Sequence, residues 1–367
     1  MILENNRMKL CLLGDVALFG RCSIAGSPDW KTYFADVADY LKSFDYVVGN
    51  LETPFSRTQK THGAKSAYLC SDVENIEILR YLNIDAVNLA NNHMFDYGSE
   101  GYETTKRLLA ENGIEYFGSE GRELKLEIAD NKLAFSGFCC YSTNPLHTVR
   151  YGKYGINELN YQTVLSVMKD LNQQGYLNIV SIHTGIEHVN FPDRTTVRSA
   201  RKLAAEMDYV FYGHHPHVSQ GIEKIDGSLL AYSLGNFCFD DVYSLVSDKP
   251  LVELSDNNRS SFLLSIEIHD NKIKAYDILP IYIGKDRIYL GKGTVSGDLD
   301  RYSKKLEEIE GSEYLQMRSS LINEYYGNRK SKRDLRWVLQ RLRPRYVRLT
   351  LDMIINKIKY KKNINEL

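Results

Sequence analysis

Five short polar clusters occur in a fixed order along the chain, and each follows an apolar run. They are Gly14-Asp15, Asn50-Leu51-Glu52, Asn91-Asn92-His93, His183-Thr184-Gly185 and Gly213-His214-His215-Pro216-His217. Carboxylates neutralise the charge of a divalent metal ion, and neutral imidazoles supply nitrogen ligands. Two such ions close together lower the pKa of a bridging water and stabilise the charge that develops on a substrate. The residue types therefore predict a metal-dependent hydrolytic site.

Three of the clusters carry little weight when each is taken alone. A Gly-Asp turn such as Gly14-Asp15 is common in proteins. Asn and Glu favour helix starts, so Asn50-Leu51-Glu52 is equally explained as the cap of a following helix. His183 ends an apolar run and can be a hydrogen-bonded core histidine. Glu187, four residues later, is a candidate hydrogen-bond partner for that ring if it binds a metal.

The remaining two clusters are more specific. Asn92 and His93 place an amide ligand beside a candidate general acid, although an Asx turn explains the two asparagines equally well. His214, His215 and His217 give the strongest signal, because three imidazoles within four residues are costly to place in a core and titrate together. Pro216 stiffens that turn. We expect metal binding here rather than simple packing.

The elements that position these clusters follow from the apolar runs. Short aliphatic and β-branched runs predict buried strands of a largely parallel sheet, at residues 10–13, 46–48, 86–89, 179–182 and 209–212. Helices are expected near residues 33–41, 73–82 and 102–110. This βαβ alternation indicates an α/β fold. Ligands in such sheets lie beyond the carboxyl ends of the strands, so we expect the polar clusters to converge there.

The later part of the chain changes character. Turns that predict hairpins occur at Asp130-Asn131, Asp226-Gly227 and Asp270-Asn271. Residues 302–326 have a helical composition, and residues 329–362 form a basic amphipathic segment with only two acidic residues. We therefore divide the chain into a hydrolase domain at 1–285 and a helical, basic C-terminal extension at 286–367. The basic segment suits an anionic membrane surface, and it equally suits packing on the main domain or on a partner.

Composition excludes several classes of protein. The formal net charge of −1 removes any whole-protein attraction to nucleic acid, so no nucleic-acid partner is expected. The first residues are polar, and the apolar run before Asp15 is too short for a signal-peptide core or a membrane span. We expect a cytoplasmic protein, with membrane association through the basic segment as the alternative.

Taken together, the clusters resemble those of the CapA family, the capsule-synthesis or poly-γ-glutamate biosynthesis proteins. Further matching residues are Gly20-Arg21, Asp96, Gly98, Glu187, Gln220, Glu223 and the run from Tyr232 to Phe237. The fold of this family is similar to that of the calcineurin-like metallophosphoesterases. The resemblance therefore implies a four-layer α/β/β/α sandwich, in which two mixed sheets stack and helices cover both outer faces.

The resemblance also implies roles for the polar residues. Asp15 and His217 would hold one ion and Glu52 would bridge. Asn92, His183 and either His214 or His215 would complete the site of the second ion. The ions would be Mn, Zn or Fe. Catalysis would fall to Asn92 and to His93, the acid toward the leaving group. The chain departs from the metallophosphoesterases at Asp15-Val16-Ala17, where Asp-x-His is usual.

Four further residues are expected near the metals, where they would orient a substrate: Arg21, Glu187, Tyr232 and Asn236. Arg21 suits a carboxylate or phosphate, because its planar guanidinium pairs with either in a bidentate manner. The expected partner is a capsule polymer or exopolymer, or a small γ-glutamyl or phosphoester compound.

The implied function is that of a metal-dependent hydrolase or transferase that uses a metal-activated water during capsule, poly-γ-glutamate or exopolysaccharide assembly. The bond attacked would be a γ-glutamyl amide, a glycopolymer linkage or a related ester. One alternative is a phosphomonoesterase or phosphodiesterase. Another is a non-enzymatic capsule assembly factor, with a vestigial metal site and a basic tail that docks on a membrane-bound synthase. Simultaneous retention of Asp15, Glu52, Asn92, His93, His183 and His217 argues against a vestigial site.

Overall fold

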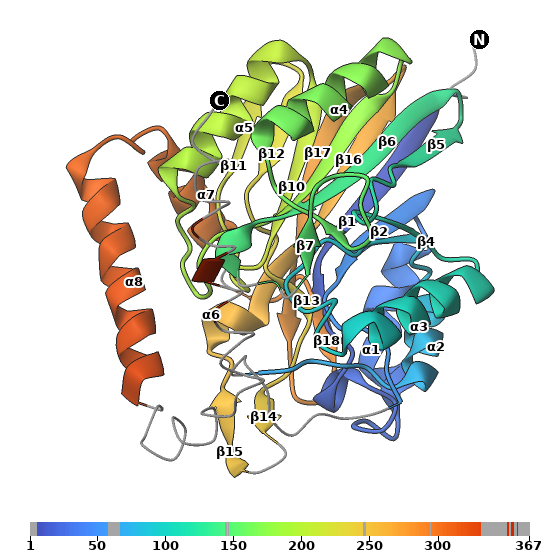
Figure 1. Ribbon diagram of the computed structural model, residues 1–367, viewed down its shortest axis with the longest axis vertical. Helices are drawn as coiled ribbons and strands as arrows, with labels where there is room; N and C mark the ends of the chain where they lie inside the picture. The colour runs from blue at the N-terminus through green and yellow to red at the C-terminus, as the bar shows by residue number, and fades with distance from the viewer. Residues whose placement is uncertain are drawn as a thin grey trace.

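Two β-sheets stack face to face, with helices against both outer faces (Figure 1). The computed structural model describes residues 6–57, 67–143, 145, 147–244, 247–293 and 295–331, together with residues 351, 354, 355 and 358. This arrangement confirms the expected four-layer α/β/β/α sandwich. Among the described residues, no helix is long and apolar enough to cross a membrane.

The first sheet contains eight described strands in the order β18-β17-β16-β1-β2-β3-β4, with β13 also paired to β1. Strands β1 to β4 and β13 run parallel, and β16 to β18 are antiparallel to their neighbours. Their bounds are β1 Arg7–Val16, β2 Tyr46–Leu51, β3 Ala86–Asn88, β4 Glu115–Phe117, β13 Asn236–Cys238, β16 Ser260–His269, β17 Lys272–Ile283 and β18 Ile288–Leu290.

The second sheet has the order β11-β12-β10-β9-β6-β5. Its four central strands run parallel, and the expected hairpins add the antiparallel edge strands β5 and β11. The bounds are β5 Leu124–Ile128, β6 Asn131–Cys139, β9 Leu177–His183, β10 Tyr209–His214, β11 Ile222–Ile225 and β12 Ser228–Ala231. Two small two-stranded sheets lie outside this core: β7 Thr148–Val149 with β8 Ile156–Asn157, and β14 Val242–Ser244 with β15 Ser247–Val252.

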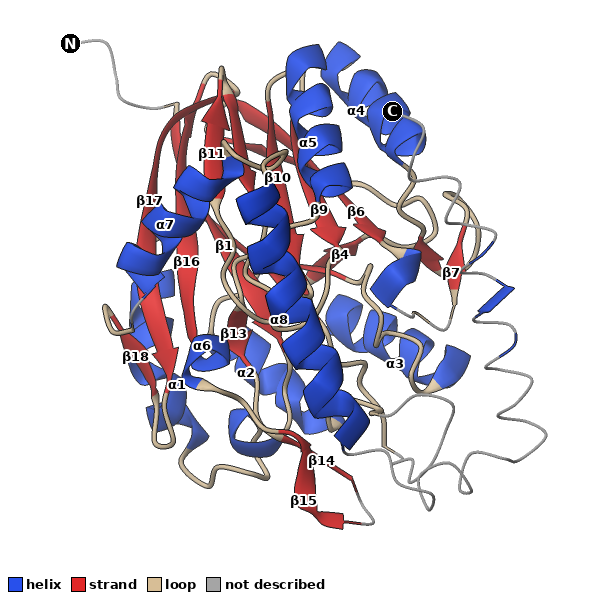
Figure 2. Cartoon of the chain, turned by 90° about the vertical axis from the view of Figure 1, so that its left-hand side faces the viewer, coloured by secondary structure: helices blue, strands red, loops and turns tan. Residues whose placement is uncertain are grey.

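Helices fill the two outer layers (Figure 2). Against the first sheet lie α1 Trp30–Leu41, α2 Ile76–Tyr81 and α3 Gly98–Glu111. Against the second lie α4 Tyr161–Gln173 and α5 Arg194–Glu206, followed at its edge by α7 Val295–Leu306 and α8 Ser312–Ser331. The short α6 Asp256–Arg259 precedes β16.

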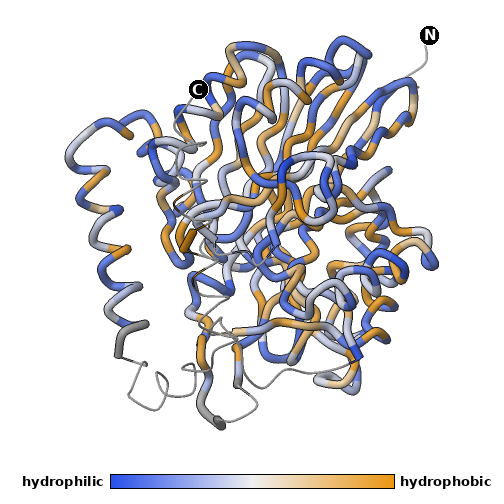
Figure 3. The backbone as a smooth tube through the Cα atoms, viewed as in Figure 1, coloured by the Kyte–Doolittle hydropathy of each residue, from blue (hydrophilic) through white to orange (hydrophobic). Residues whose placement is uncertain are grey.

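Strand β1 shows why the sandwich forms. Its side chains alternate, so that Leu10 and Leu12 enter the cluster between the sheets, whereas Cys11 and Leu13 pack with the helices. Because both faces are buried, the strand is apolar on both, as expected for a strand inside an α/β fold. Figure 3 shows the same concentration of apolar residues in the strands.

All five strands predicted from the apolar runs are present, as β1, β2, β3, β9 and β10. They divide between two sheets, because β1 to β3 belong to the first and β9 and β10 to the second. The helical expectation for 302–326 is met by α7 and α8, and Leu306, Ile309 and Tyr314 are buried against the second sheet. The division at residue 285 stays a prediction. Most of the basic segment 329–362 lies outside the described residues.

One segment joins the two sheets where the polar clusters begin. A Cβ atom added to Gly14 on β1 would lie 1.9 Å from the carbonyl oxygen of Gly235, and one added to Gly213 on β10 would lie 1.9 Å from that of Tyr232. Asp15 N donates to Gly235 O at 2.9 Å, and Leu234 N donates to Gly213 O at 3.2 Å. Residues 232–235 therefore cross both strands in backbone contact. Glycine precedes Asp15 and His214 because no side chain fits at either position.

We predict that Gly14→Ala and Gly213→Ala each lower the free energy of unfolding by about 3 kcal/mol or more, because the new methyl group must displace backbone. Gly297→Ala is the matched control. Gly297 is exposed in α7 with no atom within 4 Å of an added Cβ, so alanine should raise stability by up to about 1 kcal/mol. Urea denaturation of the three variants measures this. Equal stability of Gly14→Ala and Gly297→Ala would refute the close contact.

Candidate metal centre

A row of polar residues crosses the carboxyl edge of the first sheet. Asp15 on β1 is in register with Asn50 on β2 and with Asn236 on β13, and Asn50 is in register with Asn88 on β3. Asn88 Nδ2 donates to Asn50 Oδ1 at 2.9 Å, and Asn50 Nδ2 donates to Asp15 Oδ1 at 2.7 Å. This chain of amides fixes the Asp15 carboxylate at the junction of the two sheets.

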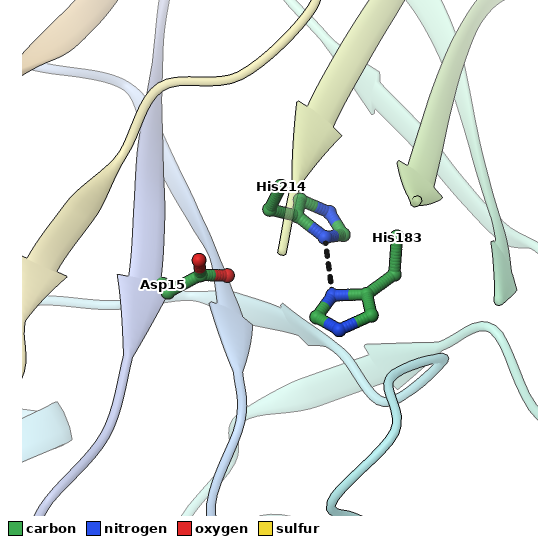
Figure 4. A group of neighbouring side chains, drawn as sticks. All are labelled: Asp15, His183 and His214. Carbon is green, nitrogen blue, oxygen red and sulfur yellow. Dashed lines mark hydrogen bonds between the residues drawn. The ribbon is translucent and has the colours of Figure 1, made fainter. Parts of the chain in front are cut away.

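The second sheet contributes a pair of histidines at the matching edge. His183 and His214 are in register at the ends of β9 and β10, and their Nδ1 atoms lie 3.0 Å apart (Figure 4). The Nε2 atom of each ring also has a hydrogen-bond partner. Asn92 Oδ1 lies 2.9 Å from His183 Nε2, and Ser181 Oγ lies 2.6 Å from His214 Nε2. The rings are thereby held with their Nδ1 atoms toward each other beside the Asp15 carboxylate.

The turn after β10 carries the other two histidines. His215 and His217 adopt left-handed backbone conformations with φ of +101° and +57°. Such conformations cost about 1 kcal/mol or more each in residues other than glycine, and they cluster at functional sites. His217 Nδ1 lies 2.9 Å from Asn236 Oδ1, which leaves Nε2 on the side of Glu52 Oε1, 3.6 Å away. His215 Nδ1 lies 3.2 Å from His183 Nε2.

The structure brings all seven predicted metal ligands together. The carboxylates and imidazoles form two groups, Asp15 with His183 and His214, and Glu52 with His215 and His217. In each group the candidate ligand atoms lie within 4.8 Å of one another. Asn92 joins them through its contact with His183. The resemblance pairs Asp15 with His217 instead, and their carboxylate and ring are also close, at 3.2 Å. The division of ligands between two ions stays a prediction.

The two carboxylates have very different surroundings. Burial raises the pKa of Glu52 well above its ordinary value, and the charge of Asp15 raises it further. Neither Glu52 oxygen receives a hydrogen bond from a described residue, although the side chain is fully buried. Burial also opposes ionisation of Asp15, but the hydrogen bond and charge of His217 outweigh it and lower the pKa of Asp15 to about 2.

Three of the four histidines are held neutral. Burial lowers the pKa of His183 well below its ordinary value, that of His214 to about 4 and that of His215 to about 3. Neutral imidazole is the form that binds metal. At His217, burial is outweighed by the charges of Glu52 and Asp15, which raise its pKa to about 10. Three neutral imidazoles and a buried Glu52 carboxylate that receives no hydrogen bond from a described residue fit a divalent cation, which would take the place of the proton on His217.

His93 forms a separate dyad next to this cluster. Its Nδ1 lies 2.6 Å from Asp96 Oδ2, and the same oxygen accepts a hydrogen bond from Leu69 N at 2.9 Å. Asp96 is fully buried, whereas His93 is at the edge of the protein with 8% exposed. Because the carboxylate holds the proton on Nδ1, a proton that His93 exchanges with a reactant would pass through Nε2.

The structure separates the two asparagines, because Asn91 forms the Asx turn and Asn92 lies against His183, and the role of Asn92 as a metal ligand stays a prediction. Asn91 Oδ1 accepts from the backbone of His93 and of Met94, each at 3.1 Å, so Asn91 forms the Asx turn. Asn92 directs its carbonyl oxygen at His183 instead. The turn formed by one asparagine therefore presents the other to the metal centre.

The four predicted substrate-binding residues have different surroundings. Asn236 holds His217, as described above, and Glu187 accepts a hydrogen bond from Tyr325 at 2.5 Å. Arg21 forms ion pairs with Asp240 and Asp241, so its charge is balanced within the protein.

Tyr232 is not brought to the cluster. Its hydroxyl donates to Glu223 at 2.7 Å, and its ring packs in the apolar cluster between the second sheet and its helices. Ser181 and Asn258 were missed from the sequence. Ser181 has the signal of a polar residue two positions before His183, hence on the same face of an apolar strand. Asn258, which donates to His217 O at 3.0 Å, has no such signal.

Comparison with known sequences gives one family. Residues 9–241 match the model of the bacterial capsule synthesis protein PGA_cap. The capsule biosynthesis protein CapA of Bacillus anthracis is 28% identical over 335 residues, which cover 84% of this chain and 78% of the relative. The PGA biosynthesis protein CapA of Bacillus subtilis (strain 168) is 28% identical over 248 residues, or 65% of each protein. The chain thus spans slightly less than two thirds of the second relative.

Similar solved structures include a putative 5′-nucleotidase from Staphylococcus aureus, with a TM-score of 0.46 and 11% identity, covering 82% of this chain and 58% of that one. The NAD nucleotidase of Haemophilus influenzae gives a TM-score of 0.40 and 12% identity, covering 89% of this chain and 60% of that one. We draw no functional conclusion from likenesses of this extent.

Glu52→Gln tests the charge of the centre. In the metal-free wild-type protein the pKa of Glu52 is raised above its ordinary value of 4.5, so stability should fall as pH rises above that value. Glutamine removes this loss. We predict that metal-free Glu52→Gln exceeds the wild type in free energy of unfolding by at least about 1 kcal/mol at neutral pH, with the difference vanishing near pH 4.5.

The same variant should lose the rise in melting temperature that Mn, Zn or Fe gives the wild-type protein, because one ligand charge is gone. Glu127→Gln, an exposed carboxylate on β5, is the control and should keep that rise. Thermal unfolding with and without metal measures both effects. A Glu52→Gln protein that is stabilised by metal as strongly as the wild type would remove Glu52 from the site.

Proposed function

Because the chain belongs to the bacterial capsule synthesis protein PGA_cap family, we propose that it is a metal-dependent hydrolase or transferase in the assembly or processing of a capsule or exopolymer. The bond attacked is a γ-glutamyl amide, a glycopolymer linkage or a related ester. A divalent metal ion bound at the centre would supply an activated water as the nucleophile in hydrolysis.

The observation that carries this proposal is the buried Glu52 carboxylate. It is fully buried, receives no hydrogen bond from a described residue, and faces His217 and His183 at 3.6 and 3.9 Å. A buried carboxylate in such surroundings is costly unless a cation balances it. A protein with no use for a metal would gain stability by replacing this residue, so its presence supports a working metal centre.

The surrounding residues then divide the work. Asn50 orients Asp15, and Asn236 orients His217, so that a carboxylate oxygen and an imidazole nitrogen point into the centre. Ser181 does the same for His214. A divalent ion held there lowers the pKa of a bound water and stabilises the charge on the substrate.

His93 is the proton donor for the leaving group. Asp96 keeps the Nδ1 proton in place, so the proton that leaves must come from Nε2. His93 is 8% exposed, whereas the Asp96 carboxylate that holds it is fully buried, and an imidazole positioned in this way can pass a proton to a leaving group. Its position outside both ligand groups agrees with a role in proton transfer rather than in metal binding.

We predict that His93→Ala lowers kcat by about 10²- to 10⁴-fold toward the true substrate while metal content stays unchanged. Asp96→Asn should lower kcat less, because the ring keeps its place but loses the carboxylate that accepts the hydrogen bond of its Nδ1 atom. Steady-state assays on γ-glutamyl peptides and on a panel of phosphate esters, paired with elemental analysis, measure these effects.

His269→Ala is the control, since His269 is a partly exposed residue on β16 next to Asp270 and should behave as the wild type. Turnover of phosphate esters alone would replace the proposed substrate class by the phosphoesterase alternative. A metal-loaded protein that turns over neither class, in which His93→Ala changes nothing, would favour the non-enzymatic assembly factor.

A further inference from the structure

Helix α8 lies outside the residues that match the family model, yet it contacts the loop that follows His183. This loop, residues 184–193, connects β9 to α5. Tyr314, Arg318 and Tyr325 of α8 each donate a hydrogen bond to it, at 2.6, 3.3 and 2.5 Å. Figure 1 shows α8 at the edge of the two-sheet body, and Figure 2 shows it extended along that side.

The hydrogen bond from Tyr325 is made to a carboxylate. Tyr325 Oη donates to Glu187 Oε2, and the Tyr325 ring lies against His188 with centroids 5.6 Å apart. Both Tyr325 and Glu187 are half-buried. The carboxylate is therefore held in a defined position by a side chain 138 residues away in sequence.

The loop is also fixed to the histidine turn of the metal centre. His188 N donates to Pro216 O at 2.7 Å, and a Cβ on Gly185 would lie 3.1 Å from Pro216 Cγ. Pro216 stands between His215 and His217, so the residues that flank Glu187 abut the metal-binding turn. In agreement, the charge of Glu187 acts on both rings: it partly offsets the burial that lowers the pKa of His215, and it adds to the charges that raise the pKa of His217. Glu187 therefore lies at the rim of the centre.

We propose that Tyr325 is a positioning residue that holds the Glu187 carboxylate at the rim of the metal centre, where it accepts a hydrogen bond from an N–H donor of the substrate and disfavours a phosphate dianion. This rests on the proposed function and names the substrate class of the same site, an amide or amine rather than a phosphate ester.

The preference for an N–H donor over a phosphate follows from the chemistry of a carboxylate. An ionised carboxylate only accepts hydrogen bonds, so it pairs with an amide or ammonium N–H and repels anionic oxygens. Arg21, the cationic candidate for binding an anion, is already neutralised by Asp240 and Asp241. The rim as described therefore favours a neutral or cationic group beside the scissile bond.

Binding of inorganic phosphate to the metal-loaded full-length protein tests the proposal, measured by isothermal titration calorimetry. Glu187→Gln removes the charge but keeps an oxygen that accepts the Tyr325 hydrogen bond, and we expect it to bind phosphate about tenfold more tightly than the wild type. Tyr325→Phe removes only the hydroxyl, so the displaced carboxylate should give a smaller gain. Tyr326→Phe is the matched control, because Tyr326 is the exposed neighbour on α8, and it should equal the wild type.

Elemental analysis and turnover complete the test. Metal content should be equal in all four proteins, and where an amide is turned over, Tyr325→Phe should raise KM with little change in kcat. The proposal is overturned if Glu187→Gln binds phosphate no more tightly than the wild type, including if it binds none. It is also overturned if Tyr325→Phe matches Tyr326→Phe, or if Glu187→Gln loses metal. Phosphate binding needs no turnover, so the binding result can be interpreted even for a protein that lacks the proposed enzymatic activity.

Discussion

The structure depends on the burial of two carboxylates close together where two sheets meet. Charged groups lose several kcal/mol of solvation when they leave water, unless hydrogen bonds or opposite charges replace it. Asp15 has such replacements in Asn50 and His217, and Glu52 has no hydrogen bond from a described residue. Burial holds His183, His214 and His215 neutral, so they add ligand nitrogens rather than positive charge, and of the four histidines His217 alone has a raised pKa. The site is thus built with a charge deficit that a divalent cation fills.

A second constraint is geometric, because the ligands come from different sheets. Residues 232–235 pass in backbone contact over β1 and β10, and this contact requires glycine at positions 14 and 213. The hydroxyl of Tyr212 adds a buried hydrogen bond across the sheets to Leu13 O. The residues that precede the ligands therefore set the distance between Asp15 and the histidines. The glycines of the Gly-Asp and Gly-His-His motifs are required for packing, and the residues that follow them supply the ligands.

Much of this could be predicted from the sequence, because each polar cluster follows an apolar run long enough to identify a strand. Convergence of the ligands within each sheet followed from the strand pattern, since residues at the carboxyl ends of parallel strands share an edge. The roles of individual residues could not be predicted from the sequence in the same way. Asn91 and Asn92 differ only in which way a turn directs them. Tyr232 and Asn236 belong to one motif, but Tyr232 packs with the helices of the second sheet and Asn236 lies on β13 of the first. The Tyr325–Glu187 contact spans 138 residues and has no local signal.

The central claim is that a metal cation completes the buried charge and replaces the proton on His217. Its most direct test is the number of protons released when Mn or Zn binds the metal-free protein near pH 7.5, measured by calorimetry in buffers of different ionisation enthalpy. Because Glu52 and Asp15 raise the pKa of His217 to about 10, the account predicts saturable binding with release of about one proton or more. Saturable binding without proton release, or no binding at all, would contradict it.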